Sequence, residues 1–393
     1  MISVLTDKKL LLIVMVGLVL QLGVLYAHFF IAPHPNSTGD SIRFEEQAKE
    51  LVEDIAEGTT WSLPRDSGSA VYILVVTLFF LLFGESILPP ILFNVVLSLA
   101  LVFIVFAIAR ELVNSRRAAY LAALLSAVFP TSILYATVLQ REALFIFFFA
   151  VSLYAFVRWM KEGKVGLMLG ALAAGIVSAI IHFGILPVLM VYSAFFLFYL
   201  PRRDRWRLVD PRELLSRTVL KWAIVLVPII FFIGTVDLSG TKYAPSLEHI
   251  NSYLQKTVER GQSSYLEDRR PSTYLQMAVQ TPERIAHFLF APFPWDIERP
   301  QDRIGLVISV TFLVVMFFTV RGLIRLGHSR RNIAIALALI MIAFLVTYAW
   351  GTSNYGTSLR HKNKIVWLMI LLFSLGVLPA SRWDLPELPQ TKR

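Results

Sequence analysis

Long apolar runs alternate with short polar segments along almost the whole chain. A helix that crosses a lipid bilayer needs about 20 predominantly apolar residues, and about ten runs reach or approach that length. They lie at residues 10–32, 89–112, 118–138, 143–160, 166–182, 184–200, 219–237, 303–322, 332–350 and 364–380. We therefore expect an all-α integral membrane protein with about ten transmembrane helices.

The basic linkers decide how one further apolar run, residues 70–83, is interpreted. Short cytoplasmic loops of membrane proteins carry an excess of Lys and Arg. Such linkers lie at residues 110–117, 158–164, 202–207 and 325–331. If Lys8 and Lys9 are cytoplasmic, all four linkers are cytoplasmic only when residues 70–83 do not cross. This run is therefore predicted to be an interfacial or re-entrant element in the first external loop, and both termini are predicted to be cytoplasmic.

This topology predicts the organisation of the chain. A transmembrane core covers residues 1–237 and includes the first external loop, 33–88. An external cap loop covers residues 238–302. The C-terminal helices cover residues 303–393, with an external basic loop at 351–363 and a cytoplasmic tail.

Two stretches of the external loops are predicted to meet the membrane surface. Apolar residues recur at helical spacing between positions 41 and 56 of the first loop, which predicts an amphipathic surface helix. The cap loop ends in an apolar, proline-punctuated stretch that places Trp295 at headgroup level.

Composition narrows the class of protein. Apolar side chains make up 56% of the 393 residues, and the mean hydropathy is +0.65. The net charge of +10 follows from the linkers between spans, so nucleic acid is excluded as a partner. The absence of Cys excludes thiol catalysis and disulfides. There is no Walker, H-E-x-x-H or G-x-S-x-G motif, and charges within the spans are too few for an ion-coupled transporter.

The loop "GTSNYGTSLRHKNK", residues 351–364, breaks the charge rule, because the topology places it outside although it is basic. Arg360, His361 and Lys362, together with Tyr355, are candidate substrate-binding residues. Cations beside apolar helices suit a phosphate or pyrophosphate whose lipid tail lies in the bilayer, since Arg binds such oxygens in a bidentate way. The alternative is that these side chains snorkel to lipid headgroups.

Two external carboxylates are candidate catalytic residues. Asp40 lies at the start of the surface helix, where it is either an ordinary N-cap or a general base for an acceptor hydroxyl. Glu142 and its neighbour Arg141 precede a span and form either a solvated pair or part of a site near Asp40. There Glu142 would share a metal or orient an acceptor. Arg141 and His182 are further candidate substrate-binding residues, and His182 either lines a cavity or is a structural hydrogen-bonding residue. No cofactor is required by these residues, and a divalent cation is one alternative.

Residues 10–200 resemble the multi-span GT-C glycosyltransferases, which include protein O-mannosyltransferases and aminoarabinose transferases. The resemblance rests on an early Asp in a long first external loop, on "FGES" at 83–86, on the basic loop after Ala109, on Pro130 and on the acidic Glu142. It implies a polyprenyl-phosphate or polyprenyl-pyrophosphate sugar donor at the outer face and inversion at the anomeric carbon. Asp40 would then be the catalytic carboxylate, and Glu142 the acidic residue of the later external turn.

Three functional hypotheses follow. In the first, a glycosyltransferase uses Arg360, His361 and Lys362 to hold the donor phosphate while Asp40 deprotonates a glycan, lipid or protein acceptor. In the second, a polysaccharide polymerase joins lipid-linked oligosaccharides, with His361 or His182 as base. In the third, a non-catalytic subunit binds or flips the lipid carrier.

Two further segments, "FLFAPFPWDI" and "NYGTSLRHK", are similar to segments of bacterial membrane proteins of exopolysaccharide or O-antigen assembly. This similarity suggests the bacterial cytoplasmic (inner) membrane as the location and the cell envelope as the destination of the product.

Overall fold

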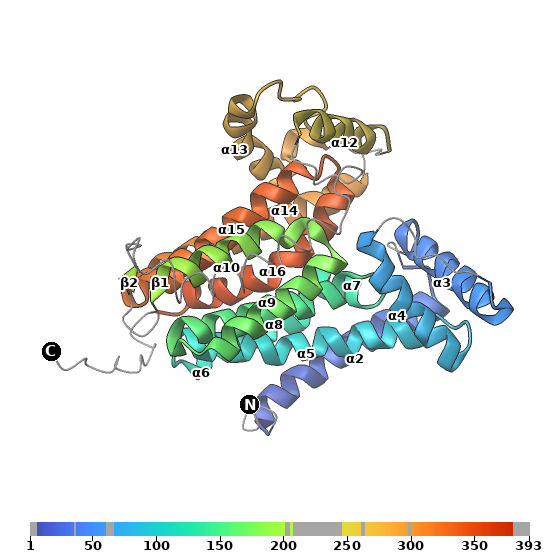
Figure 1. Cartoon of the computed structure of the whole chain (residues 1–393), viewed down its shortest axis with the longest axis horizontal. Helices are drawn as coiled ribbons and strands as arrows, with labels where there is room; N and C mark the ends of the chain where they lie inside the picture. Colours follow the sequence, from blue (N-terminus) through green and yellow to red (C-terminus); the bar gives the residue numbers. More distant parts are fainter. Residues whose placement is uncertain are drawn as a thin grey trace, which may run out of the picture.

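The computed structural model describes residues 6–34, 37–59, 67–200, 205–206, 246–260, 264–297 and 300–379. It confirms an all-α membrane protein, in which helices form an elongated bundle (Figure 1). The described strands are β1 (Tyr199–Leu200) and β2 (Arg205–Trp206), which form a short antiparallel ladder. The predicted span at 219–237 and the predicted tail from 380 onward lie outside the described residues.

The described helices have the following bounds: α2 (Lys8–Phe30), α3 (Asp40–Glu57), α4 (Ser67–Phe83), α5 (Leu88–Leu112), α6 (Arg116–Val128), α7 (Pro130–Ala136), α8 (Glu142–Glu162), α9 (Val165–Ile181), η1 (Phe183–Ile185), α10 (Leu186–Phe198), α12 (Leu247–Arg260), α13 (Tyr274–Phe290), η4 (Pro294–Asp296), α14 (Pro300–Ser329), α15 (Arg331–Trp350) and α16 (Tyr355–Val377).

Among the described residues, five helices are long and apolar enough to cross a membrane: α2, α5, α8, α14 (from Gly305) and α15. A sixth candidate is the pair α6 and α7, which is bent by 52°. The bend follows from Pro130 at the start of α7, since a proline disfavours helical backbone in the residue before it, and Phe129 is extended. Helices α4, α9 and α10 are shorter apolar helices, so the number of spans stays a prediction.

Helix α16 begins earlier than the sequence suggested. Asn354 caps it by accepting hydrogen bonds from the backbone N–H groups of Gly356 (2.9 Å) and Thr357 (3.2 Å). Residues 355–363, predicted as loop, are therefore the first turns of α16. The hydropathy pattern predicted that the helix begins only after these polar residues. They are nevertheless helical, because neighbouring helices bury several of them and supply their hydrogen-bond and ion-pair partners. Arg360 and Lys364, four positions apart, consequently share one face, and Lys362 lies on another.

The basic linkers gather at one end of the bundle, as the charge pattern predicts. Tyr120 of α6 donates a 2.6 Å hydrogen bond to Asp7, the cap of α2. Lys161, near the end of α8, pairs with Glu111, near the end of α5. Figure 1 shows α6, β1 and β2 toward this basic end, and α3, α12 and α13 away from it. We call the second region the outer end.

Both ends of α4 lie toward the outer end. Near its start, Ser69 accepts a 3.3 Å hydrogen bond from Arg141, the residue before α8. Its last residue, Phe83, precedes α5, which begins at the outer end and runs to Glu111 at the basic end. Helix α3 packs on α4 through Phe44 and Tyr72, whose ring centroids are 5.2 Å apart. This arrangement fits the predicted interfacial element at residues 70–83.

Helices α14 and α16 approach each other through two glycines. A Cβ atom added at Gly376 would lie 1.9 Å from the carbonyl oxygen of Phe318, and one at Gly322 would lie 2.0 Å from that of Leu372. Small residues allow this backbone contact, which is a common way for helices to associate within a bilayer. The contact anchors α16, which carries Arg360 and Lys364, against the rest of the bundle.

The described part of the cap region docks on the outer end. Arg284 of α13 is buried, lies 4.2 Å above the ring of Trp350 at the end of α15, and donates to the carbonyl of Arg269 at 2.5 Å. Ser264 forms a β-bridge with Asn354, next to the start of α16. The described part of the cap therefore adjoins α16, the helix that carries Arg360, His361, Lys362 and Lys364.

Candidate active site

Three side chains from distant parts of the chain meet at the outer end of the bundle. Arg360 of α16 contacts Asp40 of α3, with 2.5 Å between Nη1 and Oδ2. The Nε atom of the same guanidinium lies 3.3 Å from Oε1 of Glu142, at the start of α8. The structure thus brings together both candidate catalytic carboxylates and the most prominent candidate anion-binding residue.

Asp40 is placed by the first turn of α3 and is not its N-cap. Gly39 holds the cap position with φ of 61°, and Asp40 starts the helix itself. The carboxylate points to Arg360 and also lies 3.2 Å from Nη2 of Arg43. An acidic group in the first turn is favoured by the helix dipole. The alternative that Asp40 is an ordinary N-cap is therefore wrong, because its carboxylate pairs with Arg360 and Arg43 instead of capping α3.

Glu142 is almost fully buried, with 2% of its side chain exposed. Besides Arg360 it faces Lys364, whose Nζ lies 3.5 Å from the same oxygen. Lys364 is itself buried, and its ammonium lies 5.3 Å from the ring centroid of Tyr348. A buried carboxylate needs charged partners to offset its lost hydration, and the two cations of α16 provide them.

Two further cations border this cluster. Arg43 and Arg141 each donate a 3.3 Å hydrogen bond to the hydroxyl of Ser69. Arg141 also donates to the carbonyl of Ile181 at 3.2 Å, which ties it to the end of α9. Within the described part of the cluster the four cationic side chains outnumber the two carboxylates, so the local field favours an anion.

The charges around Asp40 set its protonation. Burial raises the pKa of the Asp40 carboxyl, but the charge of Arg360, its hydrogen bond to the carboxylate, and the charges of Arg43 and Arg141 together lower it more. The net result is a pKa below the ordinary value of 3.8. Asp40 is therefore an ionised carboxylate at neutral pH, able to accept a hydrogen bond or a proton.

His182 and His361 lie behind the cluster, in a buried network. The Nδ1 atom of His182 is 3.0 Å from the hydroxyl of Tyr348 and accepts from the N–H of Gly184 at 3.2 Å. The Nδ1 atom of His361 is 2.7 Å from the hydroxyl of Thr352. The imidazole centroids are 5.8 Å apart. Because the ring of Tyr348 also contacts the ammonium of Lys364, this network helps to hold the buried cation in place.

Lys362 and Tyr355 point toward the cap instead of the cluster. Lys362 is buried, donates to the carbonyl of Leu289 at the end of α13 (3.3 Å), and lies 4.7 Å above the ring of Phe312. The hydroxyl of Tyr355 donates to Asp296 at 3.3 Å, and its ring stacks on a cap tyrosine. Of the cations predicted to act together, only Arg360 contacts the carboxylates, because the segment is helical.

Sequence reasoning counted Lys364 among the cations of the basic loop without naming it as a substrate-binding residue, and it gave no site role to Arg43 or Ser69. For Lys364 the signal was present in its spacing of four from Arg360, which places both on one helical face once residues 355–363 are helical. Arg43 similarly follows Asp40 by three positions in α3. Ser69 carries no such signal, because its role depends on how α4 folds back against α3 and α8.

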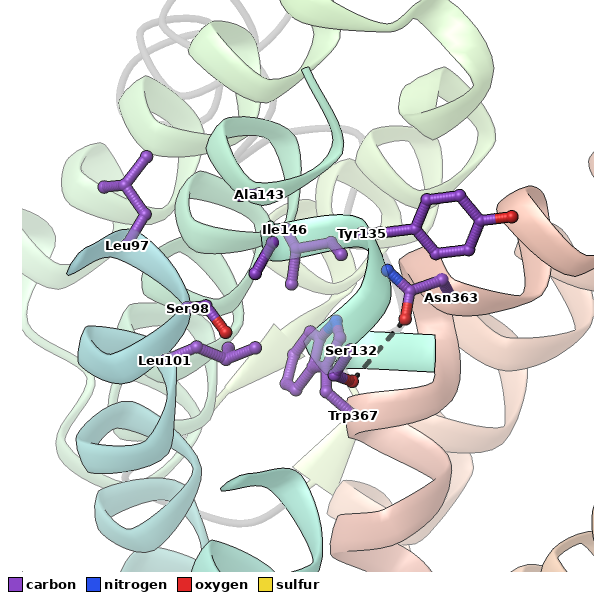
Figure 2. A pocket seen from close by; sticks show the side chains of 10 residues that line it. Leu97, Ser98, Leu101, Ser132, Tyr135, Ala143, Ile146, Asn363 and Trp367 are labelled. Carbon is purple, nitrogen blue, oxygen red and sulfur yellow. Dashed lines mark hydrogen bonds between the residues drawn. The ribbon is translucent and has the colours of Figure 1, made fainter. Parts of the chain in front are cut away.

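A cavity adjoins the cluster on its inner side (Figure 2). It is lined by residues of α5, α7, α8 and α16, among them Ala143 and Asn363, the neighbours of Glu142 and Lys364. Figure 2 shows Tyr135 beside Asn363, and Asn363 bonded to Ser132. Its lining is mainly apolar, with hydroxyl and amide groups from Ser98, Ser132, Tyr135 and Asn363.

The described residues contain no group of three or more His, Asp and Glu side chains arranged to hold a metal ion. The sequence hypothesis of a metal shared by Asp40 and Glu142 placed a cation between these carboxylates. The cation that occupies this position is the guanidinium of Arg360.

Residues 68–232 match the family model of dolichyl-phosphate-mannose-protein mannosyltransferase. The match confirms the resemblance to GT-C glycosyltransferases. It covers less than half of the chain, from α4 through α10 and beyond, and includes Glu142 but neither Asp40 nor Arg360. It supports a membrane glycosyltransferase that uses a lipid-linked sugar donor. No curated protein and no solved structure matches the chain.

Proposed function

We propose that this GT-C-type protein transfers a sugar from a polyprenyl-phosphate or polyprenyl-pyrophosphate carrier to an acceptor hydroxyl at the outer face of the membrane. The observation that carries the proposal is the contact of Asp40 with Arg360 beside Glu142, at the end of the bundle opposite the basic linkers. This contact supports the proposal, because glycosyl transfer from a lipid phosphate needs a base for the acceptor and a cation for the leaving phosphate in the same site.

In the proposed step the acceptor oxygen attacks the anomeric carbon while Asp40 takes the hydroxyl proton. The bond from the anomeric carbon to the phosphate oxygen breaks, and its electron pair stays on the phosphate. Arg360 stabilises the negative charge that develops there. Attack from the side opposite the leaving phosphate inverts the anomeric carbon. The acceptor is a glycan, a lipid or a protein.

Glu142 is proposed to position Arg360. It is too buried to meet an acceptor directly, since 2% of its side chain is exposed, and its oxygen is already shared by Arg360 and Lys364. A fixed guanidinium loses less freedom when a phosphate binds, so it is a more effective site for developing charge. Arg141 adds positive charge nearby, whereas His361 and His182 support the site from behind.

Location follows from the same arrangement. The gathering of the basic linkers supports cytoplasmic termini and a site on the outer face of the membrane. The similarity of two segments to bacterial envelope-assembly proteins supports the bacterial cytoplasmic (inner) membrane. Lipid-linked sugars used there serve the assembly of cell-envelope polysaccharide or glycoconjugates, including exopolysaccharide and O-antigen. The described part of the cap, adjoining α16, is placed to contribute to acceptor choice.

The test is sugar transfer in membranes that contain the wild type, Asp40→Asn or Arg360→Ala, supplied with radiolabelled lipid-linked sugars. Glu50→Gln is the matched control, because it removes the same charge from an exposed position of α3. Loss of single-sugar transfer in both site variants, with the control active, supports the proposal. If Arg360→Ala abolishes chain extension while Asp40→Asn keeps it, the protein is a polymerase with another base, and product length on a gel distinguishes the two.

A further inference from the structure

The guanidinium of Arg360 is shared by two carboxylates that differ in how firmly they are held. Glu142, at Nε, has a side chain that is 2% exposed and begins a helix packed within the bundle. Asp40, at Nη1, has a side chain that is 28% exposed and belongs to a surface helix. Of the two anions on this guanidinium, Asp40 is the one that can leave without opening the core.

The backbone around Asp40 permits such a movement. Gly39 precedes it with φ of 61°, and a Cβ at this glycine would meet nothing within 4 Å, so the hinge has open space around it. The body of α3 is held elsewhere, by Phe44 against Tyr72 of α4. The first turn of α3 can therefore shift while the rest of the helix stays docked.

We propose that Asp40 occupies, in the donor-free protein, the place on Arg360 that an oxygen of the donor phosphate takes when the donor binds. The inference rests on the proposed function and deepens it. A carboxylate and a phosphate are both oxyanions that accept charge-assisted hydrogen bonds from a guanidinium. A sugar linked to a polyprenyl phosphate is a phosphodiester with one negative charge, so with that donor the exchange leaves the charge paired with Arg360 unchanged.

The exchange makes the base available only after the donor has bound. While Asp40 is paired with Arg360, its proton-accepting oxygen is occupied, and the carboxylate is a poor base for an acceptor hydroxyl. Once a phosphate oxygen replaces it, Asp40 is released next to the anomeric carbon of the bound sugar. Donor binding and base release are then one event, which imposes an order in which donor precedes acceptor chemistry.

The decisive experiment measures binding of farnesyl phosphate to purified protein in micelles, for the wild type, Asp40→Asn and Glu50→Gln. Because the competing anion is removed, Asp40→Asn binds about tenfold tighter, which corresponds to about 1.4 kcal/mol. Glu50→Gln, an equal charge change on the same helix, binds as the wild type does. Equal or weaker binding by Asp40→Asn overturns the exchange, because a carboxylate that only helps to hold the site would weaken binding when lost.

A second measurement tests the exchange on the wild-type protein alone, without a substitution. Hydrogen exchange at residues 40–44 increases when farnesyl phosphate is added and does not change with farnesol, which lacks the phosphate. Unchanged or slower exchange with farnesyl phosphate overturns the proposal. Phosphatidic acid serves as the headgroup source: if it releases the first turn of α3 as well as farnesyl phosphate does, the site binds general lipid phosphates and the assignment to an isoprenoid carrier is wrong.

Sugar transfer on the same preparations separates this inference from the proposed function. Tighter binding by Asp40→Asn together with lost transfer supports both. Tighter binding with retained transfer upholds the exchange but removes Asp40 as base. Unchanged binding with lost transfer keeps Asp40 as base and overturns the exchange.

Discussion

Glu142→Gln tests whether the charged cluster is a buried, mutually dependent unit. Glu142 is the carboxylate shared by two cations of α16, the partly buried Arg360 and the fully buried Lys364. The substitution keeps the shape of the side chain and removes only its charge. Lys364 then loses its carboxylate, and Arg360 keeps only the half-buried Asp40.

The stability cost of Glu142→Gln is worked from the distances between the Glu142 carboxylate and its two cations. At 3.3 Å and 3.5 Å, each attraction is about 5 kcal/mol for an effective dielectric constant of about 20. Most of this attraction offsets the cost of removing the ions from water, but losing one partner leaves that cost uncompensated. Removing one member of a buried ion pair costs about 3–5 kcal/mol, so Glu142→Gln is expected to lower the free energy of unfolding by that amount. Lys364→Met is expected to cost less, about 1–2 kcal/mol, because Glu142 keeps Arg360.

The assay is equilibrium unfolding of the purified protein in mixed micelles, followed by the fluorescence of its 8 Trp residues. A double-mutant cycle combines Glu142→Gln with Lys364→Met. We expect the double variant to be more stable than the sum of the single losses predicts, by at least about 1 kcal/mol, since charge balance is partly restored. Glu45→Gln, which breaks the exposed pair with Lys49, is the control and is expected to cost less than about 1 kcal/mol.

Additive losses in the cycle would refute this reasoning. If the two substitutions combine within about 0.5 kcal/mol, the side chains do not interact and the cluster is not a unit. A Glu142→Gln cost no larger than that of Glu45→Gln would also refute it, because the buried carboxylate would then be dispensable for stability.

Three further outcomes are expected. Gly376→Ala lowers the free energy of unfolding by about 1–3 kcal/mol, because its Cβ has no room against α14. Lys362→Met keeps transfer close to the wild-type rate, because this side chain faces the cap. The pKa of Asp40 is lower in the folded protein than its ordinary value of 3.8, so its pairing with Arg360 stabilises α3 at pH values above 3.8. This stabilisation is lost as the pH falls through the folded pKa. Hydrogen exchange of α3 between pH 7 and pH 3 measures this loss of stabilisation.

Each has an outcome that contradicts it. Gly23→Ala in α2, where a Cβ meets nothing within 4 Å, is the glycine control, and an equal loss there would show that packing against α14 is not the cause. A loss of transfer in Lys362→Met as complete as in Arg360→Ala would place Lys362 in the site. Release of α3 above about pH 5 would mean that Asp40 titrates above its ordinary pKa of 3.8.

The hydropathy pattern predicted much of the fold because burial in lipid imposes long apolar segments. The apolar runs at 10–32, 89–112 and 332–350 correspond closely to α2, α5 and α15. The run at 118–138 is divided by Pro130, a break that length and hydropathy alone do not register. The start of α16 was missed for the opposite reason: its first turns are polar, and only tertiary partners show that they are buried.

The candidate site was predicted in its members more than in its arrangement. Asp40 and Glu142 were singled out by their positions in the external loops and by the GT-C resemblance, and Arg360 by a basic loop that breaks the charge rule. Which cation faces which carboxylate depends on the rotation of α16, and that rotation is set by its packing against α14 and by the cap at Asn354. Periodicity applied only to the apolar residues could not reveal it.

The close packing of α14 against α16 also bears on when the site forms. Both carboxylates lie in the first half of the chain, whereas Arg360 and Lys364 are on the last described helix. Because synthesis proceeds from the N-terminus, Glu142 enters the membrane before either cation exists. The nascent protein therefore lacks Arg360 and Lys364, the two cations of α16 that face Glu142, until α16 inserts, and the packing of Gly376 against α14 holds that helix in place. The charged cluster is thus complete only after the last described helix has been made and inserted.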